Sequence, residues 1–460
     1  MIIDFAITNY KSIKDTIHLN MVYNSTKSNE ELDKICNYDN YIDFFKVPTG
    51  NGDSRINVCP VMALFGANAS GKSNILKAFL ALRAIVLNGY TENFYTPFKF
   101  SSEKEQAPTK FEITFSNDSE TNPCIYQYKI EYSAHRIERE RLLKVGKTEH
   151  ATIFDTDDFN SVPKDMWQTF VTRRKPIVKA ALEVNTKEKI NSDFSTAIND
   201  TNTFFQKFFI ADDINLASIS DNIRVKNTVK NWLFRMDMKF CNIDISQVGS
   251  QKLYPDDKQI YKAPTIHQIQ DNKSSLEECN PNSLVTFLFE NYIPVFKLYD
   301  INMKYAKDGY AEKDGQDNTV SVNYMKDEST GTRNLFRFLF VLIDALQHGK
   351  IIIFDEIDRT IHTELLQFLF GIIKATNLNK YGAQMICSSH NPYIIKTVGC
   401  QGTMFVEKWS DLSTNVRFLS KHYYDSNTDI NTIVKDYLNG LLGGTPRIID
   451  IFETMEVPNA

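Results

Sequence analysis

Short apolar runs alternate with helical patterns near both ends of the chain. Val61–Phe65 is a continuous apolar run, and apolar residues at helical spacing continue from Asn74 to about Val86. Lys350–Phe354 is a second such run, and Gln384–Ser389 predicts a further strand after an intervening helical pattern. Continuous apolar runs of this length are typical of strands buried on both faces, and strand–helix–strand alternation predicts a parallel sheet. The expected fold class is α/β with a doubly wound parallel core.

Strict alternation of apolar and polar residues predicts a second, antiparallel sheet. Phe111–Phe115 and Tyr126–Tyr132 alternate cleanly, and the polar segment between them suits a hairpin loop. We expect a half-exposed sheet beside the core, and a base-stacking surface formed by its tyrosines is the alternative. Ile2–Leu19 also alternates, with a turn at Asn9–Ser12. We expect these two short strands to join the sheet that carries Val61–Phe65.

The middle of the chain carries a different pattern. From about residue 160 to residue 294 most segments, including Asn227–Phe240 and Ser283–Tyr292, place apolar residues at helical spacing. An amphipathic helix is predicted again from Asn334 to about Gln347. The expected organisation is one domain built from two separate parts of the chain, residues 1–155 and residues 298–460. A mainly helical insertion at residues 156–297 lies between these two parts in the sequence.

Composition narrows the class of protein. The chain has 460 residues, 42% of them apolar, and its formal net charge of −5 gives no general attraction to nucleic acid or to an anionic membrane surface. Seven scattered cysteines without a C-x-x-C pair argue against a disulfide framework and against a zinc site. No apolar run reaches transmembrane length, and the first residues lack the pattern of a signal peptide. We expect a cytoplasmic protein.

The segment Gly66–Ser73 has the pattern G-x-x-x-x-G-K-S between the first apolar run and its helical pattern, the context in which this pattern forms a phosphate loop. Its glycines allow main-chain N–H groups to surround phosphate oxygens, and the following helix directs its positive dipole end at the anion. Lys72 would reach the β- and γ-phosphates, and the Ser73 hydroxyl would bind Mg²⁺. The residues expected to contact the nucleotide here are Gly66, Asn68, Ser70, Gly71, Lys72, Ser73 and Asn74.

A pair of carboxylates ends the second apolar run. Asp355 and Glu356 follow it directly, and the carboxyl ends of parallel strands form the edge at which α/β sheets bind ligands. Asp355 is suited to hold Mg²⁺, and Glu356 to accept a proton from the attacking water. His390, after the next predicted strand, is placed to approach the γ-phosphate. Ser329 and Gly331 precede the amphipathic helix and offer hydroxyl, N–H and helix-dipole contacts to an anion.

The order and spacing of these motifs resemble the ABC-type ATPase heads of the SMC/RecF/OLD group. A phosphate loop, a long insertion, the Glu-Ser-Thr-Gly-Thr segment, the carboxylate pair and Ser-His-Asn-Pro follow one another in that order. Within the group the chain is most similar to stand-alone AAA-type ATP-binding proteins of bacterial anti-phage systems, of which the ATPase of the PARIS system is an example. Phe5–Ile13, Tyr437–Gly440 and Gly443–Pro446 also resemble that family. The resemblance covers about residues 1–154 and 298–446.

The resemblance implies a P-loop NTPase with an ABC-type head, an antiparallel β lobe and a helical insertion. The roles it implies are a Walker B metal ligand (Asp355), a general base (Glu356), a switch histidine (His390), a phosphate or ribose contact (Lys11) and two signature residues (Ser329, Gly331) that complete the site of a second copy. It therefore implies at least a homodimer with ATP and Mg²⁺ as cofactors. The signature is Ser-Thr-Gly-Thr in place of Ser-Gly-Gly, and no glutamine is assigned to the family's Q-loop.

Three functions stay open at this stage. The leading hypothesis is an ATPase that acts as sensor or regulator in anti-phage defence by abortive infection. It would respond to a phage-derived trigger and control a separate effector such as a nuclease, because no nuclease-like constellation is present on this chain. The alternative is a RecF-like DNA-repair ATPase that closes as a dimer around DNA. The third is a module that binds nucleotide without turnover, against which the presence of both Asp355 and Glu356 argues.

Overall fold

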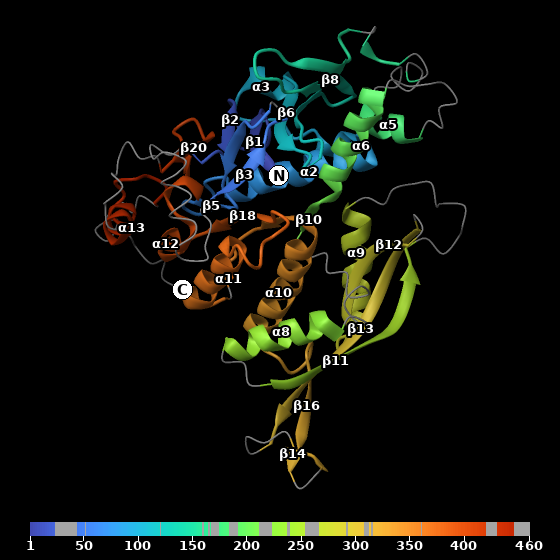
Figure 1. Ribbon diagram of the computed structural model, residues 1–460, viewed down its shortest axis with the longest axis vertical. Coiled ribbons are helices and arrows are strands. Elements are labelled where there is room, and N and C mark those ends of the chain that lie inside the picture. Colours follow the sequence, from blue (N-terminus) through green and yellow to red (C-terminus); the bar gives the residue numbers. More distant parts are fainter. Residues whose placement is uncertain are drawn as a thin grey trace, which may run out of the picture.

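The computed structural model describes residues 1–23, 44–50, 52–119, 121–158, 161–163, 166, 174–183, 192–210, 223–236, 240–253, 266–290, 293–307, 312–313, 316–359, 361–419 and 430–445. Figure 1 shows an antiparallel sheet at the top, a mainly parallel sheet in the middle and a smaller lobe below. The long helix α10 (Thr330–His348) lies between the middle sheet and the lobe.

The middle sheet, called the phosphate-loop sheet below, has the strand order β10-β17-β18-β5-β19-β20. Its first five strands run parallel and the last is antiparallel. The strands are β10 (Phe208–Ile210), β17 (Ile351–Phe354), β18 (Gln384–Ser389), β5 (Val61–Phe65), β19 (Thr403–Lys408) and β20 (Thr414–Phe418). All residues of β5 and β18 are buried, as strands covered on both faces require. The predicted parallel core is confirmed.

Helices cover both faces of this sheet. Met62 and Leu64 belong to one apolar cluster with α2 (Lys72–Asn88) and the antiparallel sheet. Ala63 and Phe65 belong to a second cluster with α10, α11 (Thr363–Lys374) and α12 (Ile395–Val398). Successive residues of a strand point to opposite faces, which explains why neighbours in β5 fall into different clusters. The apolar positions of the predicted helices therefore face the sheet.

The antiparallel sheet, called the N-terminal sheet below, has the order β2-β1-β6-β7-β8-β9. Its strands are β2 (Ile17–Asn20), β1 (Ile2–Thr8), β6 (Thr109–Ser116), β7 (Ile125–Tyr132), β8 (Ile137–Lys144) and β9 (Ala151–Asp155). The β6–β7 hairpin is confirmed. One expectation was wrong, and one alternative is excluded. The strands β1 and β2 pair within this sheet and not within the phosphate-loop sheet. Alternation of apolar and polar residues predicts a strand but does not determine the strand with which it pairs. Tyr126, Tyr128 and Tyr132 are buried, so they form no base-stacking surface.

The middle of the chain contains a third sheet. β13 (Ile293–Ala306) pairs with β11 (Phe240–Lys252) on one edge and with β12 (Leu284–Glu290) and β16 (Thr319–Asn323) on the other. The helices of this region are α5 (Ile177–Glu183), α6 (Ser192–Gln206), α8 (Ile223–Arg235) and α9 (Ile266–Cys279). The expectation of a mainly helical insertion is therefore wrong in its second half. The segment 284–290 is a short run of apolar, aromatic and β-branched residues, for which periodicity does not separate strand from helix.

The remaining elements are small. They are β3 (Phe45–Pro48), β4 (Arg55–Val58), β14 (Glu312–Lys313), β15 (Gln316–Asp317), α3 (Ser102–Gln106), α13 (Ile430–Leu438) and the 3₁₀ turns at Glu92–Phe94, Pro392–Ile394 and Cys400–Gly402. Within the described ranges, no helix combines the length and the apolar character needed to cross a bilayer.

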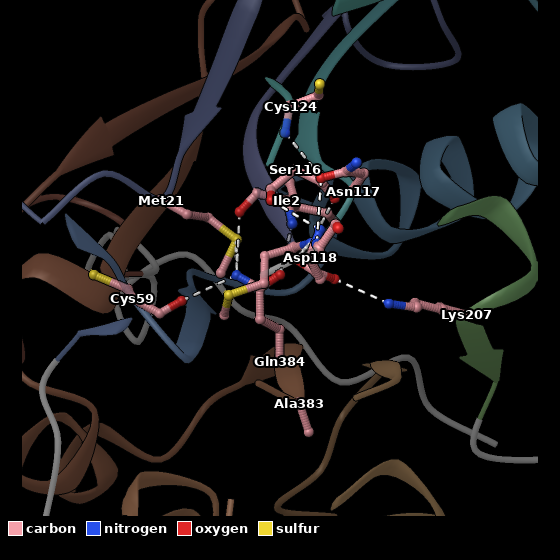
Figure 2. A network of polar contacts seen from close by, with 12 residues as sticks. Ile2, Met21, Cys59, Ser116, Asn117, Asp118, Cys124, Lys207, Ala383 and Gln384 are labelled. Carbon is pink, nitrogen blue, oxygen red and sulfur yellow. Dashed lines mark hydrogen bonds and ion pairs between the residues drawn. The ribbon is translucent and has the colours of Figure 1, made fainter. Parts of the chain in front are cut away.

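A buried polar network joins the two large sheets (Figure 2). The side-chain oxygen of Gln384, the first residue of β18, accepts the Ile2 N–H at 2.7 Å, and its NH₂ group donates to the carbonyls of Ile2 and Cys59. Beside it, the Met1 amino group and the Lys207 ammonium both bind the Asp118 carboxylate. The two cations hold the pKa of Asp118 below its usual value against the effect of burial. β18 is thus tied to the N-terminal sheet at its amino end.

Candidate nucleotide site

The phosphate loop connects β5 to α2 through backbone conformations that only small residues adopt easily. Ala69 and Gly71 have positive φ angles of 62° and 113°. A Cβ atom on Gly71 would lie 2.1 Å from Thr414 Oγ1, and one on Gly66 would lie 2.3 Å from the Val406 carbonyl oxygen. Both glycines of the motif are therefore required by the packing of the loop against β19 and β20. The geometry explains why the motif has glycine at these two positions.

Lys72 begins α2 and is 6% exposed. Its ammonium group donates to the carbonyls of Gly66 and Ala67 at 2.7 and 2.9 Å, so it lies under the loop. Burial lowers the Lys72 pKa, and the nearby carboxylates of Asp355 and Glu356 act in the opposite direction. The phosphate-loop lysine and the carboxylate pair, which are nearly three hundred positions apart in the sequence, are thus close in space.

The carboxylate pair lies directly after β17, at the edge where the loop after β5 also emerges. β17, β18 and β5 are parallel neighbours, so their carboxyl ends share one edge. Asp355 and Glu356 are both exposed, and Glu356 lies 3.6 Å from Arg359 in an exposed ion pair. The Asp355 carboxylate and the Ser73 hydroxyl on the first turn of α2 are oxygen ligands of the kind that Mg²⁺ takes together with phosphates. The donor set therefore fits a nucleotide-bound Mg²⁺.

His390 follows β18 at the same edge and is exposed. Its main-chain N–H donates to Oδ2 of Asp358 at 2.9 Å, which connects the histidine to the turn that carries the carboxylate pair. The neighbouring Asn391 caps the following 3₁₀ turn through the Tyr393 N–H. The predicted switch histidine and Walker B residues are thus brought together, while Asp358 was not predicted.

The turn after β1 touches the start of α2. Asn74 donates through its side-chain NH₂ to Ser12 Oγ at 2.7 Å, and Thr414 Oγ1 lies 2.8 Å from the same oxygen. Lys11, with a positive φ of 53°, lies on this turn with its ammonium 5.7 Å from the Tyr10 ring centre. Burial, followed by repulsion from two other lysines, lowers the pKa of Lys11. The Asn74 side chain is engaged by this turn, and a contact of Lys11 with phosphate or ribose stays a prediction.

Ser70 and Asn68 have different surroundings within the loop. Asn68 is exposed at its tip. Ser70 is buried, its carbonyl accepts the Thr414 hydroxyl at 2.8 Å, and its own Oγ has no hydrogen-bond partner among the described residues. The buried hydroxyl at a phosphate loop is a polar atom that an anion would satisfy. Ser12 and Thr414 support this loop and were missed, because no local pattern connects positions so far apart.

The C-terminal segment packs at the base of the loop. The ring of Tyr437 on α13 stacks on Phe405 with ring centres 5.1 Å apart, and its edge faces Phe65 at the end of β5. A Cβ atom on Gly444 would lie 3.5 Å from the Gly66 Cα. The segments Tyr437–Gly440 and Gly443–Thr445 therefore support the start of the phosphate loop, whereas Pro446 lies outside the described residues.

The signature residues lie elsewhere. Ser329 is the N-cap of α10, and its hydroxyl accepts the Thr332 N–H at 3.1 Å. Glu328 accepts a hydrogen bond from Tyr305 of β13 at 2.6 Å, so the lobe holds this turn. Ser329 is exposed and Gly331 is half-buried. Among the described residues, no hydrogen bond or ion pair connects them to the phosphate loop of the same copy.

Comparison with known proteins places these features in a family. The family model described as "AAA domain, putative AbiEii toxin, Type IV TA system" matches residues 61–231 and 245–396, more than two thirds of the chain. The chain belongs to this family. The matching model is that of an AAA domain, and the phosphate loop between β5 and α2 gives the chain a P-loop NTPase fold. ATP hydrolysis with a divalent metal is the general activity of such families.

Three solved structures are similar to this chain at low sequence identity. One is an Smc head bound to the C-terminal winged-helix domain of ScpA, with 11% identity, a TM-score of 0.41, and coverage of 92% of this chain and 99% of that one. The SMC head of Thermotoga maritima has 11% identity, a TM-score of 0.35 and coverage of 91% and 99%. The Smc head of Pyrococcus yayanosii with a coiled coil and joint has 11% identity, a TM-score of 0.37 and coverage of 95% and 99%. No curated protein matches the chain.

Proposed function

We propose that this ATPase hydrolyses ATP at a site shared between two copies and uses the nucleotide state to control a separate effector in anti-phage defence. The observation that carries the enzymatic part is the proximity of Lys72 to Asp355 and Glu356, because it joins a phosphate-binding loop to a metal ligand and a base. Each is needed for phosphoryl transfer to water, which depends on positioning and charge stabilisation.

Within one site, the protein groups divide the work. Lys72 and the loop N–H groups bind the phosphates, and Ser73 with Asp355 would hold Mg²⁺, which supplies charge neutralisation when bound. Glu356 accepts the proton of the attacking water, and His390 approaches the γ-phosphate from the neighbouring strand end. The loose ion pair of Glu356 with Arg359 is solvent-exposed, so it holds the base only weakly.

The signature turn supports the shared site. It lies at the exposed N-terminus of a 19-residue helix and has no polar contact with its own phosphate loop among the described residues. An exposed serine hydroxyl at the N-terminus of a long helix suits the phosphates of a nucleotide on a second copy. ATP would then join two heads, and hydrolysis would release them.

The defence role is supported by the family description, which names an AbiEii toxin and a type IV toxin–antitoxin system. Within the described residues there is no group of three or more His, Cys, Asp or Glu that could hold a metal ion of the chain's own. The proposal assigns any nucleolytic output to a separate effector protein. A phage-derived trigger would act by shifting the nucleotide-dependent assembly.

The experiment that tests the ATPase and the shared site is a solution mass measurement with and without ATP–Mg²⁺. Glu356→Gln should bind ATP, lose turnover by about a hundredfold or more, and accumulate a dimer or larger species. Glu364→Gln, the same change at an exposed position of α11, is the matched control and should behave as wild type. A wild type that neither turns over ATP nor changes mass would contradict the proposal. Co-purification from cells expressing the neighbouring genes would test for the effector.

A second function, ATP-dependent clamping of DNA, is favoured by one surface. Lys77 and Lys99 are exposed, both lie near Lys11, and no described carboxylate pairs with any of the three. Phe100 next to them is 64% exposed and packs edge-on against Phe98. Unpaired cations with an exposed ring suit a nucleic-acid strand. DNA binding that falls steeply with salt, and that Lys77→Glu with Lys99→Glu abolishes, would support it. Absence of DNA binding would exclude the function, and binding unchanged by these variants would exclude this surface.

A further inference from the structure

The main chain at Glu356 adopts a conformation that side chains rarely take. Its φ angle is +50°, in the left-handed region, immediately after β17. For a residue other than glycine this region is unfavourable, because Cβ comes too close to the following carbonyl oxygen. Such a conformation persists only where the surrounding structure holds it in place. The contacts of this turn therefore show what fixes the general base.

Ser388 on the neighbouring strand makes those contacts. Its Oγ accepts the N–H of Glu356 at 2.7 Å, and its carbonyl accepts the N–H of Ile357 at 3.1 Å. Its hydroxyl donates to Oδ1 of Asp355. Ser388 is fully buried, and the parallel pairing of β17 with β18 places it directly beside the turn. One residue thus contacts both carboxylate positions and the residue that follows them.

The direction of these hydrogen bonds is fixed by proton count. A serine hydroxyl carries one proton, and its lone pairs accept others. Since Oγ accepts the Glu356 N–H, its single proton goes to Asp355. Asp355 is held as an acceptor at Oδ1, which restricts the rotation of its carboxylate. Its Oδ2 has no hydrogen-bond partner among the described residues and is available to a metal ion.

We propose that Ser388 is a positioning residue that sets the Asp355 carboxylate and the left-handed Glu356 turn at the same time. The inference rests on the proposed function, in which Asp355 binds Mg²⁺ and Glu356 accepts a proton from water. Ser388 touches neither substrate nor metal. It acts by coupling the two carboxylates through one hydroxyl group, so that losing the hydroxyl disturbs metal binding and catalysis together.

The test compares Ser388→Ala with Ser389→Ala. Ser389 is the next residue of the same strand and is equally buried, and its Oγ accepts the Asn391 N–H at 2.9 Å without contacting either carboxylate. Ser388→Ala should lower kcat or raise the Mg²⁺ concentration for half-maximal turnover by about 10- to 100-fold, the usual effect of losing a group that orients a metal ligand. Its affinity for ATP without Mg²⁺ should not change. Ser389→Ala should leave both unchanged, and Ser388→Thr should restore part of the loss.

Hydrogen–deuterium exchange in the absence of nucleotide gives a readout independent of activity. Exchange in the segment 351–359 should accelerate in Ser388→Ala and not in Ser389→Ala. Equal effects of the two alanine variants, or wild-type behaviour of Ser388→Ala, would overturn the inference. A wild type without turnover would defeat the proposed function instead, and unchanged exchange in Ser388→Ala would still overturn the role of Ser388.

Discussion

The Thr414 hydroxyl donates to the main-chain carbonyl of Ser70 at 2.8 Å, across 344 positions of sequence. Thr414 is the first residue of β20, and Ser70 lies inside the phosphate loop. The same hydroxyl oxygen lies 2.8 Å from Ser12 Oγ on the turn after β1. Two segments outside the motif, the start of β20 and the turn after β1, therefore hold the phosphate loop by hydrogen bonds, and the shape of the loop depends on them.

Removing these hydrogen bonds should weaken nucleotide binding. Thr414→Val keeps the size of the side chain but leaves the buried Ser70 carbonyl without its donor, which costs about 1–3 kcal/mol. We expect weaker binding of a fluorescent ATP analogue together with a lower unfolding temperature. Thr414→Ser keeps the hydroxyl and is the control, expected close to wild type. Equal affinities for the valine and serine variants would show that the hydrogen bond does not shape the loop.

Gly71→Ala should abolish tight nucleotide binding. The added methyl group would meet Thr414 Oγ1 at 2.1 Å in a backbone with φ of +113°. Overpacking of this kind typically costs about 1–3 kcal/mol in addition to the backbone strain. Gly52→Ala has positive φ and no atom within 4 Å, so it isolates the strain alone and should bind nucleotide normally. Isothermal titration with ATP compares the two, and normal binding by Gly71→Ala would contradict the packing argument.

Ser329→Asp should distinguish the role of Ser329 as the N-cap of α10 from its proposed contact with a nucleotide on a second copy. Aspartate caps a helix as well as serine does, so the stability of the protein should be retained, whereas Ser329→Ala should lose about 1 kcal/mol. The added negative charge would repel the phosphates of a nucleotide on a second copy. We therefore expect normal thermal unfolding and no ATP-dependent increase in mass for the aspartate variant. ATP-dependent assembly of this variant would place the contact between copies elsewhere.

Glu140 should make stability fall as pH rises through the neutral range. Burial raises the pKa of this carboxyl group to about 7, although the Tyr128 hydroxyl and the Ile177 N–H donate to it. In the unfolded chain a glutamate titrates near the ordinary value of 4.5. Between these two values the folded state binds one more proton than the unfolded state, so unfolding becomes easier with increasing pH and levels off above about 7.

Urea unfolding of wild type and Glu140→Gln from pH 5 to pH 8 measures this effect. The wild type should lose stability relative to the glutamine variant as pH rises across that window. Glu112→Gln, on the same sheet, is the control and should follow the wild-type profile. Parallel curves for wild type and Glu140→Gln would mean that Glu140 stays ionised in the folded protein throughout.

The strands, loops and helices that carry the site could be predicted from the sequence because a local pattern of consecutive residues determines each of them. Val61–Ser73 contains a strand, a loop and a helix start, and Lys350–Glu356 contains a strand followed by two carboxylates. The partners of these elements could not be predicted in the same way. The pairing of β1 with β6 and the contact of Thr414 with Ser70 depend on chain folding over long separations.

The prediction of a mainly helical insertion failed because the spacing of apolar residues there fits a helix and a strand equally well. Residues 284–290 are apolar at both helical and strand spacing, and only their pairing with β13 decides for a strand. Ser388 escaped notice for a different reason. A serine near the end of a strand has no distinguishing signal until the left-handed turn at Glu356 is seen beside it.

Hydrogen bonds fix β18 at both of its ends. The Gln384 side chain fastens the first residue of the strand to Ile2 and Cys59, while the last residues of the strand hold the Glu356 turn and carry His390. The strand is only six residues long, about 20 Å from end to end. In the proposed function the nucleotide contacts His390 at one end of β18, and Gln384 ties the other end to the N-terminal sheet. The strand therefore connects the nucleotide site with the opposite side of the phosphate-loop sheet.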